Sequence, residues 1–268
     1  MTLHPEQAAL CPQTATRIGS ISLVGAGPGT RDLLTFRAAS RLQQADVVFY
    51  DRLVDPAILD IARPGAQRIF VGKHVGANAW PQTRINRAIV AAALQGQRVV
   101  RLKSGDPSIF GRASEEIAAA RAAGIVVEIV PGITAASAAA ASLCQPLTER
   151  GQTDRIVFVT GTCRPGDPPP DIAACLQPGT AVAIYMGVHR LAEIQAELLT
   201  AGLDPQSDIA MVSHTGTSAE QRLTAPLCQL SSAAKAANMQ NPAIIFVRNP
   251  KAARSNASTL SALNTVLL

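Results

Sequence analysis

Short runs of β-branched residues alternate with longer Ala- and Leu-rich stretches, and this alternation limits the fold more than any other feature of the chain. In the first half, strands are expected at residues 21–27, 45–51, 68–72, 97–106 and 125–132. Helices are expected at 32–45, 82–96, 114–124 and 134–143, where apolar residues recur with a helical period. Such a succession is typical of an α/β domain with a largely parallel sheet.

The alternation breaks at about residues 147–154 and then resumes. Strands are expected at 155–162, 180–187, 208–216 and 242–249, with helices at 189–202 and 230–237. We therefore predict two α/β domains, 19–147 and 148–250, preceded by a loose arm (1–18) and followed by a tail (251–268). Ligands of such proteins bind at the carboxyl ends of the strands, which favours a cleft between the domains.

Composition narrows the class of ligand. Aromatic residues make up only 3% of the chain, so the core must be built from Ala, Val, Ile and Leu. Without aromatic platforms, binding of single-stranded nucleic acid is disfavoured, and we predict no nucleic acid partner. The net charge of +5 fits a generic basic protein as well as a basic cleft for a polyanionic substrate.

The five cysteines and four histidines show no C-x-x-C or H-x-x-H spacing. This pattern favours reduced thiols, a cytoplasmic protein and no metal site. The first 20 residues lack the basic start and apolar region of a secretory signal. No stretch approaches the roughly 18 apolar residues of a membrane-spanning helix, so no membrane partner is expected.

The first strand leads into a glycine loop, residues 25–29 (GAGPG). Glycines at a strand-to-helix turn allow positive φ and a close approach of a ligand to the backbone. A nicotinamide dinucleotide site is one alternative, because Asp51 ends the second strand where a ribose-binding acid would lie. Against it, Thr30 stands where that motif has its last glycine, and Pro28 stiffens the loop. A plain tight turn is the other alternative.

Eight segments between residues 19 and 247 together resemble the tetrapyrrole methylase family. They are VGAGPGTRDLLT, ADVVFYDRLV, VGKHVG, VVRLKSGDPSIFGR, EIVPGITAASAAAA, IYMG, GTSAEQR and NPAIIFV, in the family's order. YDRLV and GK, with the downstream Gln82 and Asn86, are most similar to members that methylate uroporphyrinogen III rather than a later corrin or a non-tetrapyrrole target. The resemblance implies a two-domain α/β fold that binds S-adenosylmethionine between its domains, and a homodimer.

The resemblance also implies which residues bind the methyl donor and its product, S-adenosylhomocysteine. The implied set is Pro28, Ser104, Gly105, Asp106, Ile109, Thr134, Ala135, Met186, Gly216 and Ala243. These residue types suit a ligand with a sulfonium, an amino acid and an adenosine, which needs close backbone approach, one carboxylate and an apolar wall. The ordinary alternatives are a turn at Asp106-Pro107 and core packing by Met186.

For the reaction, the resemblance implies two successive methylations of uroporphyrinogen III, through precorrin-1 to precorrin-2, for sirohaem, cobalamin or haem d1 synthesis. Each transfer needs an electron-rich pyrrole carbon in line with the methyl group, in a cleft poor in water. A carboxylate can then take the released proton. The resemblance assigns the proton acceptor to Asp51 and the proton donor to Lys73, whereas a turn cap and a solvated surface charge are the ordinary alternatives.

The acetate and propionate arms of such a substrate favour guanidinium groups, which bind carboxylates through two hydrogen bonds. Arg52, Arg112 and Arg150 lie beside the motifs and are the candidates. Glu115 is a candidate for a pyrrole N–H, although the helix dipole also favours a carboxylate in a first helical turn.

Three positions depart from the usual family pattern. Thr30 replaces an acid after the glycine loop, Ser104 replaces a glycine in SGDP, and Glu149 replaces a histidine in LTERG. None of these changes removes a residue assigned to the reaction.

Overall fold

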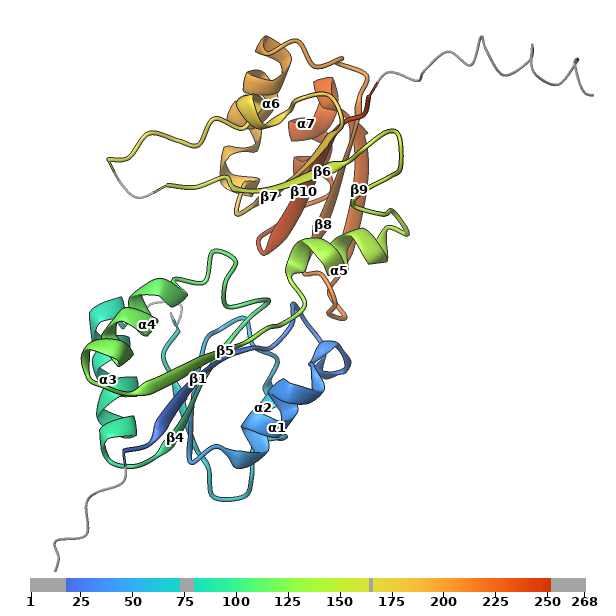
Figure 1. The fold of residues 1–268 in the computed structure, drawn as a ribbon. Helices are drawn as coiled ribbons and strands as arrows, with labels where there is room; N and C mark the ends of the chain where they lie inside the picture. Colours follow the sequence, from blue (N-terminus) through green and yellow to red (C-terminus); the bar gives the residue numbers. More distant parts are fainter. Residues whose placement is uncertain (1–17, 73–79, 164–165, 252–268) are drawn as a thin grey trace, which may run out of the picture.

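The computed structural model describes residues 18–72, 80–163 and 166–251 and contains two five-stranded sheets (Figure 1). The first sheet has the order β3-β2-β4-β1-β5, and the pairings between its strands are parallel. Its strands are β1 (Ser20–Gly25), β2 (Val47–Tyr50), β3 (Gln67–Phe70), β4 (Arg98–Lys103) and β5 (Val126–Val130). The predicted parallel sheet of the first half is therefore confirmed.

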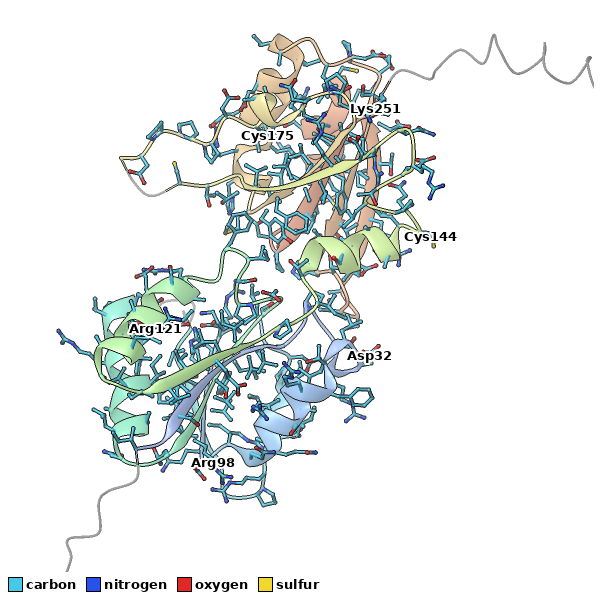
Figure 2. All side chains as sticks on the ribbon, viewed as in Figure 1. Asp32, Arg98, Arg121, Cys144, Cys175 and Lys251 are labelled. Atoms are coloured by element: carbon cyan, nitrogen blue, oxygen red, sulfur yellow. The ribbon has the colours of Figure 1, made fainter. Side chains whose placement is uncertain are left out.

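Helices cover both faces of this sheet, and apolar side chains fill the space between the layers (Figures 1 and 2). α1 (Phe36–Gln44) and α2 (Pro56–Leu59) pack on one face, and α3 (Gln82–Leu94) and α4 (Ala113–Ala122) pack on the other. The helix expected at 32–45 begins only at Phe36, because Thr35 caps it by accepting the N–H of Ala38 at 3.2 Å. The sequence interpretation missed α2, which Asp55 caps.

The second sheet is mixed, with the order β6-β7-β10-β8-β9. Its strands are β6 (Arg155–Thr160), β7 (Thr180–Tyr185), β8 (Asp208–Ser213), β9 (Gln221–Pro226) and β10 (Ala243–Asn249). Only β6 and β7 run parallel; β10 is antiparallel to β7 and β8, and β9 is antiparallel to β8. The sequence interpretation missed β9, whose polar residues give no apolar run.

One helix of the first half packs on the second sheet. α6 (Leu191–Thr200) and α7 (Leu230–Ala236) cover one face of that sheet, and α5 (Ala135–Ser142) covers the other. Ala136 and Ala139 of α5 lie in a buried cluster with Phe246 of β10. The domain limits stay a prediction, and packing groups α5 with the second sheet. Within the described residues, no helix is long and apolar enough to cross a membrane.

Candidate active site

The loops that follow β1, β4 and β5 meet at one edge of the first sheet. Because parallel strands end at the same edge, their carboxyl-terminal loops are brought together. Gly27 and Gly105 exchange backbone hydrogen bonds, with N···O distances of 3.2 Å from Gly27 and 2.7 Å from Gly105. The structure thus brings the loop of Pro28 beside the loop that runs from Ser104 to Ile109.

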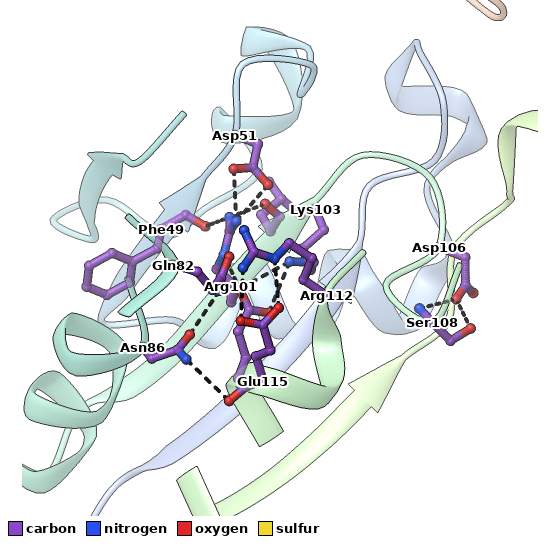
Figure 3. Close-up of polar contacts among 12 residues, drawn as sticks. Phe49, Asp51, Gln82, Asn86, Arg101, Lys103, Asp106, Ser108, Arg112 and Glu115 are labelled. Atoms are coloured by element: carbon purple, nitrogen blue, oxygen red, sulfur yellow. Dashed lines mark hydrogen bonds and ion pairs between the residues drawn. The ribbon is translucent and has the colours of Figure 1, made fainter. Parts of the chain in front are cut away.

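Asp106 shapes the second of these loops. Its Oδ1 accepts the backbone N–H of Ser108 at 2.7 Å and the hydroxyl of Ser108 (Figure 3). Its Oδ2 accepts the N–H of Gly132 at 3.0 Å. The backbone carbonyl of Asp106 accepts from Ile109 at 3.2 Å. The carboxylate therefore connects the turn after β4 to the loop after β5. The turn at Asp106-Pro107 is the one predicted above as the ordinary alternative to a donor-binding role.

Residues of the second sheet reach this edge through Tyr185. Its hydroxyl lies 2.6 Å from Oγ1 of Thr134 and accepts the N–H of Ala136 at 3.2 Å. The ring of Phe110, in the loop after β4, packs against it with 5.1 Å between ring centroids. Thr134 and Ala135 thus lie at the start of α5, next to the end of β7. Tyr185 belongs to the IYMG motif, but the sequence interpretation singled out only Met186.

Gly216 contacts the glycine loop directly. Its carbonyl accepts the N–H of Thr30 at 2.8 Å. A Cβ atom on Gly29 would lie only 2.0 Å from the same carbonyl oxygen, so the two backbones touch where neither has a side chain. This contact brings a residue predicted from the second half beside the loop predicted from the first half.

Met186 and Ala243 lie at neighbouring ends of paired strands. β10 pairs with β7 so that Ile244 is opposite Tyr185, which places Ala243 and Met186 beside this last pair. Met186 has a left-handed backbone (φ 55°) and an exposed fraction of 42%, whereas Ala243 is buried. The exposure of Met186 argues against its being a residue of the core.

Asp51 follows β2 at the same edge and lies over a buried ionic cluster (Figure 3). Its two carboxylate oxygens accept from Nη2 of Arg101 at 2.8 and 2.7 Å. Arg101 also donates from Nε to Oε1 of Glu116 at 3.0 Å, and Nζ of Lys103 lies 3.1 and 3.0 Å from the two oxygens of Glu116. Burial lowers the pKa of Lys103, as does the positive charge of Arg101, while Glu116 opposes this shift.

The sequence interpretation missed Arg101, Lys103 and Glu116. Arg101 and Lys103 lie in β4, the central strand of a parallel sheet that is covered on both faces. Charged residues are rarely buried without a partner, so two cations in such a strand indicate a buried acidic partner. This was the sequence signal that could have revealed the cluster. Their partner Glu116 is in α4 and looks like an ordinary first-turn carboxylate in the sequence.

Gln82 and Asn86, two residues of the resemblance, lie beside this cluster. Nε2 of Gln82 donates to Oε1 of Glu116 at 3.2 Å and to Oδ1 of Asn86 at 2.9 Å. Asn86 in turn donates to the backbone carbonyl of Glu115 at 3.3 Å. Lys73, the predicted proton donor, lies outside the described residues.

The four predicted substrate-binding residues occupy different positions. Arg112 precedes α4 with φ 56° and forms an ion pair with Glu115, with N···O distances of 2.8 and 2.9 Å. The hydrogen bond to Glu115 raises the pKa of Arg112. Arg52 is exposed next to Asp51, and Arg150 is exposed in the turn before β6. The structure thus joins Arg112 to Glu115, and the roles of all four stay predictions.

Two cavities, of about 310 and 280 Å³, lie away from these loops. The first is lined by residues that include Arg41, Arg98 and Glu128, and the second by residues that include Leu203 and Arg248. Neither is lined by a predicted site residue.

Comparison with known proteins shows the family of the chain. Residues 20–231 match the family described as Tetrapyrrole (Corrin/Porphyrin) Methylases. A siroheme synthase of Psychrobacter sp. (strain PRwf-1) is 44% identical over 230 residues, which cover 86% of this chain and 47% of the relative. The chain spans about half the length of the curated relatives it matches.

Solved structures are similar over nearly their whole length. The uroporphyrin-III C-methyl transferase of Thermus thermophilus, solved with S-adenyl homocysteine, is 36% identical with a TM-score of 0.73. The match covers 86% of this chain and 92% of that one. A cobalt precorrin-4 methyltransferase is 24% identical with a TM-score of 0.75, over 85% of this chain and 94% of that one, and this likeness concerns the fold alone.

Proposed function

Because the chain belongs to the tetrapyrrole (corrin/porphyrin) methylase family, we propose that it methylates uroporphyrinogen III twice, through precorrin-1 to precorrin-2, with S-adenosylmethionine as the methyl donor. The observation that carries this proposal is the likeness to the Thermus thermophilus uroporphyrin-III C-methyl transferase, which extends over 92% of that chain. The similarity to siroheme synthases supports a role in sirohaem synthesis; cobalamin and haem d1 synthesis are the other uses of such a product.

Residues at the carboxyl edge of the first sheet and at the neighbouring ends of β7 and β10 fit the donor. Gly105 has φ +70°, and a Cβ placed on it would meet nothing closer than the backbone nitrogen of Ala135, at 4.0 Å. Oδ1 of Asn241, two residues before Ala243, is buried without a hydrogen-bond partner among the described residues, so an amino group there would satisfy it. We propose that the ten residues of the implied donor set hold this molecule, which supplies an electrophilic methyl group when bound.

Asp51 is the proposed proton acceptor of the reaction. Its side chain is 32% exposed, so a substrate can reach it, and Arg101 holds both of its oxygens. A carboxylate in a fixed orientation suits general-base catalysis. We propose Lys73 as the proton donor, by the family resemblance.

The guanidinium groups of Arg52, Arg112 and Arg150 are the proposed partners of the acetate and propionate arms. Arg112 is occupied by Glu115 in this structure, and both side chains are partly exposed. Substrate binding would replace the ion pair of Arg112 and Glu115 with two contacts to the substrate. Arg112 would bind the carboxylate of an arm, and Glu115 would accept a hydrogen bond from a pyrrole N–H. We propose further that the protein is cytoplasmic. We also propose that it acts as a homodimer, and native mass spectrometry of the purified protein tests this oligomeric state.

The test of the proposed function is an anaerobic incubation of the purified protein with enzymatically generated uroporphyrinogen III and S-adenosylmethionine, followed by mass spectrometry. The expected product carries two added methyl groups; because each transfer also releases a proton, the mass rises by two CH₂ units. A product with one added methyl would show that the reaction stops at precorrin-1. If S-adenosylhomocysteine binds but no tetrapyrrole is modified, the substrate assignment is wrong.

A further inference from the structure

Three charged side chains lie buried behind Asp51. The exposed fractions of the side chains are 3% for Arg101, 6% for Lys103 and 0% for Glu116, against 32% for Asp51. The four charges sum to zero, and only Asp51 reaches the surface. Asp51 is therefore the member of the cluster that a substrate can reach.

All three nitrogens of the Arg101 guanidinium donate hydrogen bonds, and two of the three donate to groups other than Asp51. Its Nε donates to Glu116 at 3.0 Å, and its Nη1 donates to the backbone carbonyls of Leu102 at 3.1 Å and Phe49 at 3.4 Å. Nη2 is left for Asp51, and it binds both oxygens of that carboxylate. Because a guanidinium is planar and rigid, fixing Nε and Nη1 also fixes the direction of Nη2.

Glu116 is itself held from two directions. Lys103 donates to both of its oxygens and Gln82 donates to Oε1, so its carboxylate cannot turn away from Arg101. The hydrogen bonds from Gln82 in α3 and from Arg101 and Lys103 in β4 converge on Glu116 in α4, and Arg101 connects this group to Asp51 at the end of β2 (Figure 3).

Stabilisation of the fold does not by itself explain why a protein would bury such a cluster of charges. Well-packed apolar residues in the place of a buried ion pair are often as stabilising, since burying charges carries a large desolvation penalty. A buried network of charges that ends on one partly exposed carboxylate can also hold that carboxylate in one orientation. A base held in this way needs no reorganisation when it accepts a proton.

We propose that Arg101 and Glu116 are positioning residues: Glu116 fixes the guanidinium of Arg101, which holds Asp51 in the orientation that accepts a proton from the methylated tetrapyrrole. This inference rests on the proposed function, in which Asp51 is that acceptor. Neither residue touches the substrate. The loss of either one misplaces Asp51 and slows turnover without weakening the binding of the donor.

A double-mutant cycle on the full chain tests the proposal, with Asp51→Asn, Glu116→Gln and the double variant. We expect Glu116→Gln to lower kcat about tenfold or more, because misplacing a reacting group by about 1 Å can cost about a hundredfold. KM for uroporphyrinogen III and the Kd of S-adenosylhomocysteine should change less than about twofold. In the Asp51→Asn background, Glu116→Gln should lower kcat no further, since its effect acts through Asp51.

Two further variants separate the proposed role of Glu116 from misfolding and from the general effect of losing an ion pair. Glu116→Asp retains the charge and should recover part of kcat, and it replaces Glu116→Gln if that protein does not fold. Glu128→Gln is the matched control: it removes the carboxylate from another ion pair, that of Glu128 and Arg41, and should leave kcat unchanged.

The outcomes separate the inference from the proposed function. Equal losses from Glu116→Gln in both backgrounds, no loss in either, or an equal loss from Glu128→Gln would overturn the inference and leave the role of Asp51 intact. Full turnover by Asp51→Asn would overturn the role of Asp51 and the inference with it. A wild-type protein that methylates no tetrapyrrole would overturn the proposed function itself.

Discussion

The hydroxyl of Tyr185, at the end of β7, is hydrogen-bonded to Oγ1 of Thr134 at 2.6 Å and so joins the second sheet to the loop that leaves the first. The same hydroxyl accepts the N–H of Ala136 at 3.2 Å. Burial raises the pKa of Tyr185, so the phenol keeps its proton at neutral pH. It can therefore donate to Thr134 while it accepts from Ala136.

Tyr185→Phe should lower the free energy of unfolding by about 1 to 2 kcal/mol, because it leaves the Thr134 hydroxyl and the Ala136 N–H without this partner. Urea denaturation followed by circular dichroism measures the change. Thr134→Val removes one of the same bonds, so the double variant should lose less than the sum of the two single losses. Additive losses would show that the two groups do not interact.

Gly29→Ala should be strongly destabilising, by about 3 kcal/mol, because its Cβ would lie 2.0 Å from the carbonyl oxygen of Gly216 and backbone atoms cannot move aside easily. Thermal denaturation gives the loss, and calorimetry should show weaker binding of S-adenosylhomocysteine. The control is Gly65→Ala, where φ is +84° and no atom lies within 4 Å of the added Cβ. That control should cost about 1 to 2 kcal/mol, and the prediction fails if the two variants are equally stable.

Arg112→Ala should weaken uroporphyrinogen III binding by about tenfold, since it removes a charged hydrogen-bond donor for an arm of the substrate. The affinity for S-adenosylhomocysteine should stay the same. Stability should fall by less than about 1 kcal/mol, because the Arg112 and Glu115 side chains are 56% and 36% exposed. Arg68→Ala, which breaks the exposed pair of Arg68 with Asp60, is the control for loss of surface charge. Unchanged substrate affinity in Arg112→Ala would remove Arg112 from the proposed binding set.

Asp46 should make stability depend on pH at the acidic end. The hydrogen bond from the Arg98 side chain lowers the pKa of Asp46 from 3.8 to about 2, so its contribution is present above pH 4 and is lost as the pH falls through 2. Arg98 lies at the end of the first sheet that points away from the second (Figure 2), so turnover should be unaffected. Its side chain is 54% exposed, and we therefore expect Asp46→Asn to cost only about 1 kcal/mol at pH 7.

Urea denaturation of wild type and Asp46→Asn from pH 7 to pH 2 measures this dependence. The difference between the two proteins should shrink between pH 4 and pH 2. Asp60→Asn, at a more exposed ion pair, should show a smaller difference at pH 7. A difference that stays constant down to pH 2 would contradict the assignment.

The sequence could predict the parallel sheet and the edge at which its loops meet. Buried parallel strands read as continuous apolar runs, and the loops that follow them share an edge, so the loops of Pro28 and Asp106 could be expected at the same edge. Their direct contact depends on the pairing of β1 with β4, which chain order does not give. Strand direction in the second sheet could not be predicted in this way. β9 is half exposed and polar, and it forms only because β8 offers it a partner.

The ionic cluster was hidden for a different reason. The charges of Arg101 and Lys103 are compensated by Glu116, which lies on the helix after the next loop. Nothing in the local sequence pattern predicts that these three side chains meet. Tyr185 is similar, because its hydroxyl acts across the gap between two sheets whose relative placement depends on tertiary contacts. Local patterns thus specified elements and loops, whereas the pairing of distant polar groups required the folded chain.

The packing of α5 has a consequence for the order in which the protein is made. Its alanines are covered by β7, β8 and β10, and Phe246 of β10 is synthesised about 100 residues after α5 itself. At about 5 to 20 residues per second, α5 waits on the order of 5 to 20 s before its covering sheet exists. Alanine is the smallest apolar side chain, so this helix exposes little surface to aggregation during that interval.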